Sequence, residues 1–172
     1  VSASAADEDA TRGAVERACR QALDDLVAAR KREGAKLAQV VGERVAAMRR
    51  RVDAGAPLIP QSISLYEQKL KEKLREALGS SDDERVRAEI ALYAVKIDVG
   101  EEIDRLRTHL AEVERTLAKG GAAGKRLDFL AQELNREANT LASKAASQAV
   151  SDCALELKLL VEQIREQVQN IE

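Results

Sequence analysis

Apolar residues recur at steps of three and four along most of the chain, which is the spacing of one face of an α-helix. The pattern is clearest in residues 124–145, where one stripe carries Leu127, Leu130, Leu134, Ala138, Leu141 and Ala145. It predicts further helices over residues 7–53, 62–78, 81–119 and 153–171. No segment shows sustained alternation of apolar and polar residues with β-branched enrichment, so we expect no sheet.

Short breaks separate these predicted helices. Ala54–Pro57 reads AGAP, residues 79–84 read GSSDDE, and residues 120–124 read GGAAG. Long helices with short connections favour an all-α fold of elongated antiparallel long-helix hairpins, packed as a helical bundle. We predict two domains, a hairpin of two long helices over residues 1–78 and a set of C-terminal helices over residues 79–172.

Composition supports long helices and limits the ways in which the chain could bind nucleic acid. Charged residues make up 34% and hydrophobic residues 45%, which is typical of long helices. One Phe, two Tyr and no Trp leave few side chains on which bases could stack. The formal net charge of -2 gives no global attraction for a polyanion, so any phosphate site must be a local cluster or depend on bound cations.

The two cysteines and the single histidine exclude a structural zinc site of the usual kind. Cys19 and Cys153 are far apart in sequence, and we predict that both are small buried residues of a cytoplasmic protein, with no disulfide between them. No apolar run approaches the roughly 20 residues that a membrane-spanning helix needs.

The predicted helix over residues 124–145 has an unusual polar surface. Asn, Ser and Thr compete with the backbone for hydrogen bonds and weaken helices, so a concentration of them indicates other partners. The polar positions are Gln132, Asn135, Arg136, Asn139, Thr140 and Ser143, with carboxylates at Asp128, Glu133 and Glu137 and cations at Lys125, Arg126, Arg136 and Lys144. A polar helix that bonds to neighbouring helices is the alternative.

A second candidate site lies in Ile97–His109, IDVGEEIDRLRTH. At about 100° per residue, one face of the helix carries Asp98, Glu101, Glu102, Arg105 and His109. Clustered carboxylates repel one another unless a cation lies among them, and oxygen ligands suit Mg²⁺ or Mn²⁺, with the imidazole favouring Mn²⁺. His109, the only histidine, is a candidate metal ligand or general base. The alternative is a solvated face with ion pairs between residues four apart.

The segments GKRLDFLAQELNREANTLASKA and LELKLLVEQIREQVQNIE resemble the C-terminal signature of the YicC-like family, described as bacterial stress-induced proteins and metal-dependent endoribonucleases. The resemblance extends to IDVGEEIDRLRTH and more loosely to ARKREGAKL at Ala29–Leu37. It implies an endoribonuclease that uses Mn²⁺ or Mg²⁺ and acts on RNA rather than DNA in RNA turnover or the stress response. It also implies a cytoplasmic homo-oligomer such as a hexameric ring, and a family N-terminal domain that this chain lacks.

The activity that the resemblance implies, together with the groups that the two candidate segments carry, suggests roles for their residues. The expected catalytic residues are Glu101, Glu102, His109 and Glu133. The expected metal ligands are Asp98, Glu102, His109, Asp128 and Glu137. The expected RNA contacts are Arg105, Lys125, Arg126, Arg136, Asn139 and Lys144. The rival hypothesis is a non-catalytic helical scaffold or adaptor whose polar helix binds a partner protein.

Overall fold

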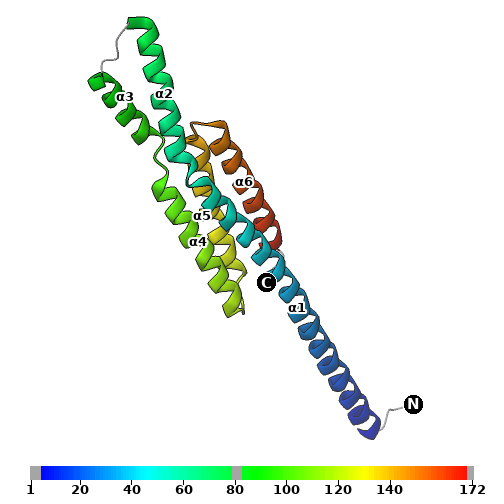
Figure 1. Cartoon of the computed structure of the whole chain (residues 1–172). Coiled ribbons are helices and arrows are strands. Elements are labelled where there is room, and N and C mark those ends of the chain that lie inside the picture. Colours follow the sequence, from blue (N-terminus) through cyan, green and yellow to red (C-terminus); the bar gives the residue numbers. More distant parts are fainter. Residues whose placement is uncertain (1–4, 79–82, 170–172) are drawn as a thin grey trace. The chain divides into compact units, whose positions relative to one another are not determined.

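A computed structural model describes residues 5–78 and 83–169 of the chain (Figure 1). Its helices are α1 (Ala5–Gly55), α2 (Leu58–Leu78), α3 (Asp83–Lys96), α4 (Gly100–Lys119), α5 (Gly124–Ser143) and α6 (Gln148–Val168). Within these ranges every regular element is a helix and none is a strand, so the predicted all-α fold without a sheet is confirmed. None of the described helices combines the length and the apolar character that crossing a membrane requires.

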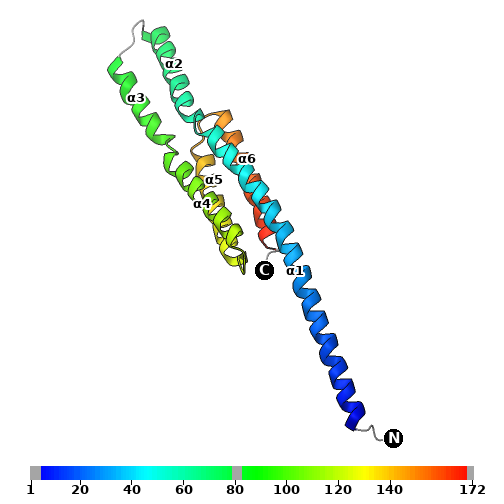
Figure 2. The same ribbon diagram turned by 60° about the horizontal axis from the view of Figure 1, so that its bottom comes forward.

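The chain divides into two compact units, residues 1–39 and residues 40–172. The first unit contains the N-terminal part of α1, and the second contains the remainder of α1 together with α2 to α6. The domain boundary that the sequence suggests between residues 78 and 79 stays a prediction. Within the second unit the antiparallel partner of α2 is α3, which lies beside it in both views (Figures 1 and 2).

The core of the second unit is built by α4, α5, α6 and the C-terminal part of α1. Helix α5 packs against both α4 and α6, which makes it the central helix of this group. The apolar stripes of the four helices meet, and the fully buried large side chains of this core are Val41, Val45, Met48, Val99, Leu106, Leu110, Leu127, Leu130, Leu134, Leu157 and Ile164. Because these stripes are buried in the core, the polar residues of α4 and α5 lie on the remaining sides of the two helices.

Helix α2 begins earlier than the sequence predicts. The predicted start at residue 62 is wrong, because the helix begins at Leu58 and includes Pro60 in its first turn. Proline is tolerated there, since the first N–H groups of a helix have no acceptor within it. The Ser62 hydroxyl donates instead to the Leu58 carbonyl oxygen at 2.9 Å. Farther along, the ring of Tyr66 stacks on that of Tyr93 of α3, with the ring centres 3.8 Å apart.

The single helix predicted over residues 81–119 is wrong, because the chain breaks between α3 and α4. The Asp98 carboxylate accepts a hydrogen bond from the Gly100 N–H at 2.9 Å, so the side chain closes a turn around residue 99. Ile97 and Val99 are nevertheless buried, at 3% and 0% exposure. The apolar spacing therefore continues across a break in the helix.

Short connections join α4, α5 and α6. Gly120 and Gly121 adopt φ values of 65° and 81°, a left-handed conformation that glycine reaches without strain, and they turn the chain from α4 into α5. Ser147 precedes α6, and its hydroxyl accepts a hydrogen bond from the Val150 N–H at 3.4 Å. Both turns are short, so α4, α5 and α6 run antiparallel in sequence order.

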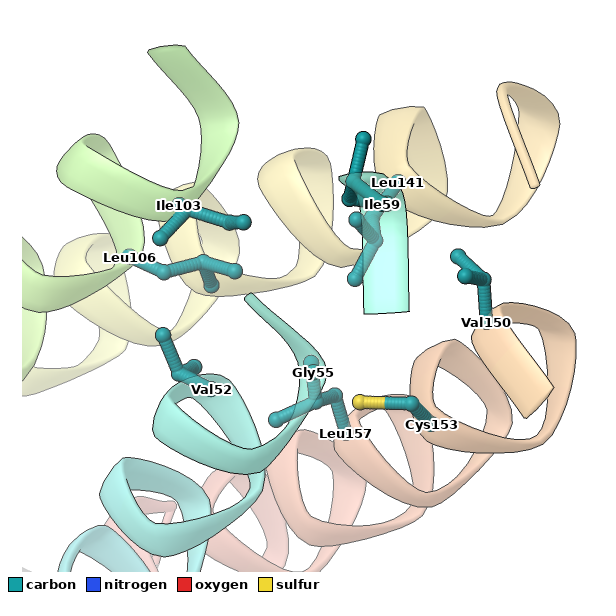
Figure 3. A pocket seen from close by; sticks show the side chains of 9 residues that line it. All are labelled: Val52, Gly55, Ile59, Ile103, Leu106, Leu141, Val150, Cys153 and Leu157. Carbon is teal, nitrogen blue, oxygen red and sulfur yellow. The ribbon is translucent and has the colours of Figure 1, made fainter. Parts of the chain in front are cut away.

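The cysteines differ from the prediction. Cys19 is exposed, so its predicted burial is wrong, while Cys153 of α6 is partly buried. Burial raises the pKa of the Cys153 thiol. The Cys153 Sγ donates to the Arg51 carbonyl oxygen at 3.4 Å and points toward Gly55 in the wall of a small apolar cavity (Figure 3).

Gly55 lies where a larger residue would strike the Cys153 sulfur. A Cβ atom added at Gly55 would be 2.7 Å from Sγ, so Gly55→Ala forces the thiol to move. We expect the substitution to lower the free energy of unfolding by about 1 kcal/mol, the strain outweighing the better helix propensity of alanine.

Urea unfolding checks this expectation, and Cys153→Ala supplies the control. In that background the clash is absent, so Gly55→Ala should become neutral or stabilise by up to about 1 kcal/mol. An equal loss of stability in both backgrounds would contradict the proposed contact.

Candidate metal centre

Polar side chains from α4 and α5 meet along one side of the antiparallel pair. We call this set of contacts the α4–α5 seam. Its four levels, in order along α4, are Glu102 with Lys144, Arg105 with Glu137, His109 with Glu133 and Glu137, and Glu112 with Arg126. The seam therefore combines both sequence-predicted segments in one place.

The third level of the seam gathers three groups that could bind a metal ion. Ligand atoms of His109, Glu133 and Glu137 all lie within 4.8 Å of one another. Glu137 is buried, with 3% of its surface exposed, whereas His109 and Glu133 are partly exposed. Two carboxylates and one imidazole form a donor set that accepts Mn²⁺, and the partial exposure leaves a route from solvent. The donor set therefore fits the divalent ion that the family resemblance implies.

The charge balance differs between the levels of the seam. Lys144 neutralises Glu102 at 2.8 Å, and Arg126 lies 3.4 Å from Glu112. Glu133, by contrast, forms no ion pair with any residue in the described ranges. Uncompensated negative charge therefore collects at the third level, which favours binding of a cation there.

Arg105 connects the third level to the exposed edge of α4. Its guanidinium pairs with Glu101 four residues earlier and lies 3.5 Å from Glu137 Oε1. The charge of Glu101, followed by that of Glu137, raises the pKa of Arg105, so the guanidinium stays charged. Arg105 thus restrains the Glu137 carboxylate from the α4 side.

Glu102 lies on the seam but outside the three-residue group. Its Oε1 accepts from Lys144 Nζ at 2.8 Å, and Lys144 also donates to the Asp98 carbonyl oxygen at 2.9 Å. Glu102 is 7% exposed, and its Oε2 is buried without a hydrogen-bond partner. The pair thus joins the end of α5 to the start of α4, and Lys144 is already engaged there.

Three other predicted carboxylates do not join the His109 group. The Asp98 carboxylate accepts a hydrogen bond from the Gly100 N–H. Glu101 is exposed and pairs with Arg105. Asp128 accepts from Gln132 Nε2 at 2.8 Å. It lies about 140° around α5 from Glu133, so it faces away from the seam.

The predicted RNA contacts on α5 differ in where they lie relative to the seam. Lys125 and Arg136 are exposed and lie within about 80° of Glu133 around α5, so they flank the seam. Arg126 is exposed too, with its guanidinium carbon 5.5 Å from the centre of the Phe129 ring. Asn139 is exposed, but it lies about 120° from Glu133.

Glu112 is a seam residue that sequence reasoning missed. It accepts from Arg126 Nη2 at 3.4 Å and also pairs with Arg115. It follows His109 by three residues, so helical spacing alone puts it on the same side of α4.

Comparison with known proteins gives the family. Residues 56–172 match the family described as "Endoribonuclease YicC-like, C-terminal". The chain is 41% identical over 150 residues to "Probable endoribonuclease YicC" of Haemophilus influenzae, covering 87% of this chain and 52% of that protein. It is 34% identical over 169 residues to the protein of the same description in Clostridioides difficile, covering 96% of this chain and 58% of that protein.

The chain thus spans a little over half the length of these curated relatives. The family match covers most of the chain, including α2 to α6 and the whole α4–α5 seam. The chain belongs to the YicC-like endoribonuclease family.

Proposed function

We propose that this chain carries the metal-holding part of an endoribonuclease that cleaves phosphodiester bonds of RNA. The observation that supports the proposal best is the convergence of His109 from α4 with Glu133 and Glu137 from α5. The relatives described as probable endoribonucleases support the reaction class. We further propose, from the family resemblance, a role in bacterial RNA turnover or stress response.

Each residue of the group has a separate task in this proposal. Glu133 and Glu137 offer carboxylate oxygens and His109 offers a ring nitrogen to the divalent ion, with Mn²⁺ favoured over Mg²⁺ because of the imidazole. When bound, the ion supplies stabilisation of the negative charge that develops on the phosphate oxygens. Arg105 holds Glu137 in position while leaving Glu133 free of any ion pair within the described part of the chain.

Binding of RNA falls to the exposed cations beside the seam. Lys125 and Arg136 flank the group on α5 and form no ion pair with other described residues, so their charges are available to phosphates. Because the net charge is -2, attraction for RNA must be local. We expect the affinity for RNA to fall as the salt concentration rises, and the fall is steeper the more phosphates the chain contacts.

The test is cleavage of a labelled structured RNA by a chain that includes this sequence and any residues that precede it in its gene. Cleavage should require Mn²⁺, stop with EDTA, and fall by about a hundredfold or more in His109→Ala. Asp104→Asn is the matched control, since Asp104 is exposed on α4 and outside the seam; its activity should match the unmodified protein. Cleavage that persists in EDTA or in His109→Ala would overturn the assignment.

The rival hypothesis, a non-catalytic scaffold or adaptor, predicts a different outcome of the same experiment. A scaffold shows no metal-dependent cleavage, and His109→Ala changes nothing but partner binding. Three levels of the seam suit either hypothesis, because they pair a carboxylate with Lys or Arg. The third level, His109 with Glu133 and Glu137, supports the endoribonuclease hypothesis, because it gathers possible metal ligands.

A further inference from the structure

The only phenylalanine of the chain, Phe129, lies on the exposed side of α5. This residue is 48% exposed, and no other large apolar side chain of α4 or α5, both of which the structure describes in full, is exposed to this degree. Single exposed apolar residues are common on protein surfaces, so the groups around the ring decide what it can bind.

The exposed neighbours of Phe129 along α5 are charged or polar. Lys125 lies one turn before it and Arg136 about two turns after it, within about 40° and 20° of it around the helix. Neither cation forms an ion pair with other described residues, and Gln132, about 60° away, is exposed as well. A flat ring between available cations is typical of surfaces that bind single-stranded nucleic acid, whereas the centre of a protein interface would surround the ring with further apolar residues.

Arg126 restrains the ring from one side. Its guanidinium carbon lies 5.5 Å from the centre of the Phe129 ring, and its Nη2 lies 3.4 Å from Oε1 of Glu112 on α4. The cation is attracted to the π electrons of the face that it covers, which leaves the opposite face for another flat group. A nucleobase is such a group, and every base offers a face that can stack.

The ring also lies beside the candidate metal centre. Glu133 follows Phe129 by four residues, which places it about 6 Å farther along α5 and about 40° around it. We propose that Phe129 stacks one unpaired base of the RNA, next to the phosphodiester bond at the group of His109, Glu133 and Glu137. The inference rests on the proposed function, because it requires RNA to lie along the α4–α5 seam.

This stacking defines the class of RNA that the chain accepts. Bases inside a double helix stack on one another, so only an unpaired nucleotide can present its face to a protein ring. The substrate is therefore RNA with a loop, a bulge or a single-stranded end at the cleaved bond.

The first test is the affinity for a labelled RNA hairpin with a single-stranded loop, measured by fluorescence anisotropy in EDTA. The protein is the chain with any residues that precede it in its gene. Phe129→Leu, which stays apolar but has no flat face, should weaken binding by about tenfold, whereas Phe129→Tyr should bind within about twofold of the unmodified protein. Leu155→Ala is the control, because it removes an exposed apolar side chain from α6 and should leave the affinity unchanged.

Two results of this test would overturn the proposal. One is equal affinity of Phe129→Leu and the unmodified protein. The other is a change in the mass of the Phe129→Leu protein in sedimentation equilibrium, because it would identify the ring as a contact between subunits.

The second test places an abasic nucleotide at each loop position in turn. At one position the missing base should weaken binding to the unmodified protein by about tenfold and to Phe129→Leu by less than about twofold, because the stacking partner is already absent there. Cleavage with Mn²⁺ should occur directly beside that position, and a cut elsewhere would contradict the placement of the base next to the metal centre.

The same scan separates this inference from the proposed function. Equal abasic effects in both proteins would refute stacking on Phe129 even where cleavage requires Mn²⁺ and His109. An abasic effect that depends on Phe129, without any metal-dependent cleavage, would refute the proposed endoribonuclease activity and support Phe129 as an RNA contact.

Discussion

Replacing Glu133 with Gln is expected to weaken Mn²⁺ binding by about tenfold to a hundredfold, since the site loses a charged ligand while the side chain keeps its shape. Glu133 forms no ion pair among the described residues and is partly exposed, so the fold should tolerate the change. Electron paramagnetic resonance of free Mn²⁺ during a titration of the purified chain measures the affinity directly and does not depend on RNA.

Asp128→Asn is the matched control for this experiment. It removes one carboxylate from the same helix by the same chemical change, but Asp128 bonds to Gln132 on another side of α5. Its Mn²⁺ affinity should stay within about twofold of the unmodified chain. A large loss in Asp128→Asn together with none in Glu133→Gln would contradict the metal centre proposed at the third level.

The buried side of the helices could be predicted from the sequence. Leu127, Leu130, Leu134, Ala138 and Leu141 are all buried in α5, as their spacing predicts. This prediction works because the direction of a helical side chain depends only on its position along the helix. No knowledge of the neighbouring helices is needed to find the stripe.

The break between α3 and α4 could not be found from the same spacing. Ile97 and Val99 are apolar and buried, so they continue the pattern through a segment that is not helical. The local signal is Asp98 two residues before Gly100, a combination in which the side chain can bond to the backbone and compete with the helix.

The candidate metal centre could be predicted only in part. Helical spacing places Glu102, Arg105 and His109 on one side of α4, but which residues of α5 they meet depends on the length and direction of the turn at Gly120 and Gly121. The separation of Asp128 from Glu133 could have been seen from the sequence, because about 140° lies between them around one helix. Counting angles on one helix is reliable, whereas register between two helices needs the structure.

The role of Lys144 also needed the structure. The sequence offers it as an RNA contact, yet its ammonium group bonds to Glu102 and to the Asp98 carbonyl oxygen. Because this ammonium group already pairs with a buried carboxylate, it attracts a phosphate only weakly. The exposed cations Lys125 and Arg136 are therefore the better candidates for RNA.

Replacing Lys144 with Met is expected to lower the free energy of unfolding by about 2 kcal/mol. The substitution leaves the Glu102 carboxylate, 7% exposed and with one oxygen already unpartnered, without its cation. Removing one partner of a fully buried ion pair costs about 3–5 kcal/mol, and the partial exposure of Lys144 reduces that figure. Urea denaturation monitored by circular dichroism measures the loss.

A second substitution distinguishes the ion pair from the packing of the lysine stem. In Lys144→Met with Glu102→Gln the buried charge is gone, so we expect more than half of the lost stability to return. Lys125→Met is the control, because Lys125 is exposed and forms no ion pair with other described residues; it should change stability by less than about 0.5 kcal/mol. Failure of Glu102→Gln to restore stability would mean that Lys144 acts through its contacts with the backbone at Asp98 rather than by neutralising Glu102.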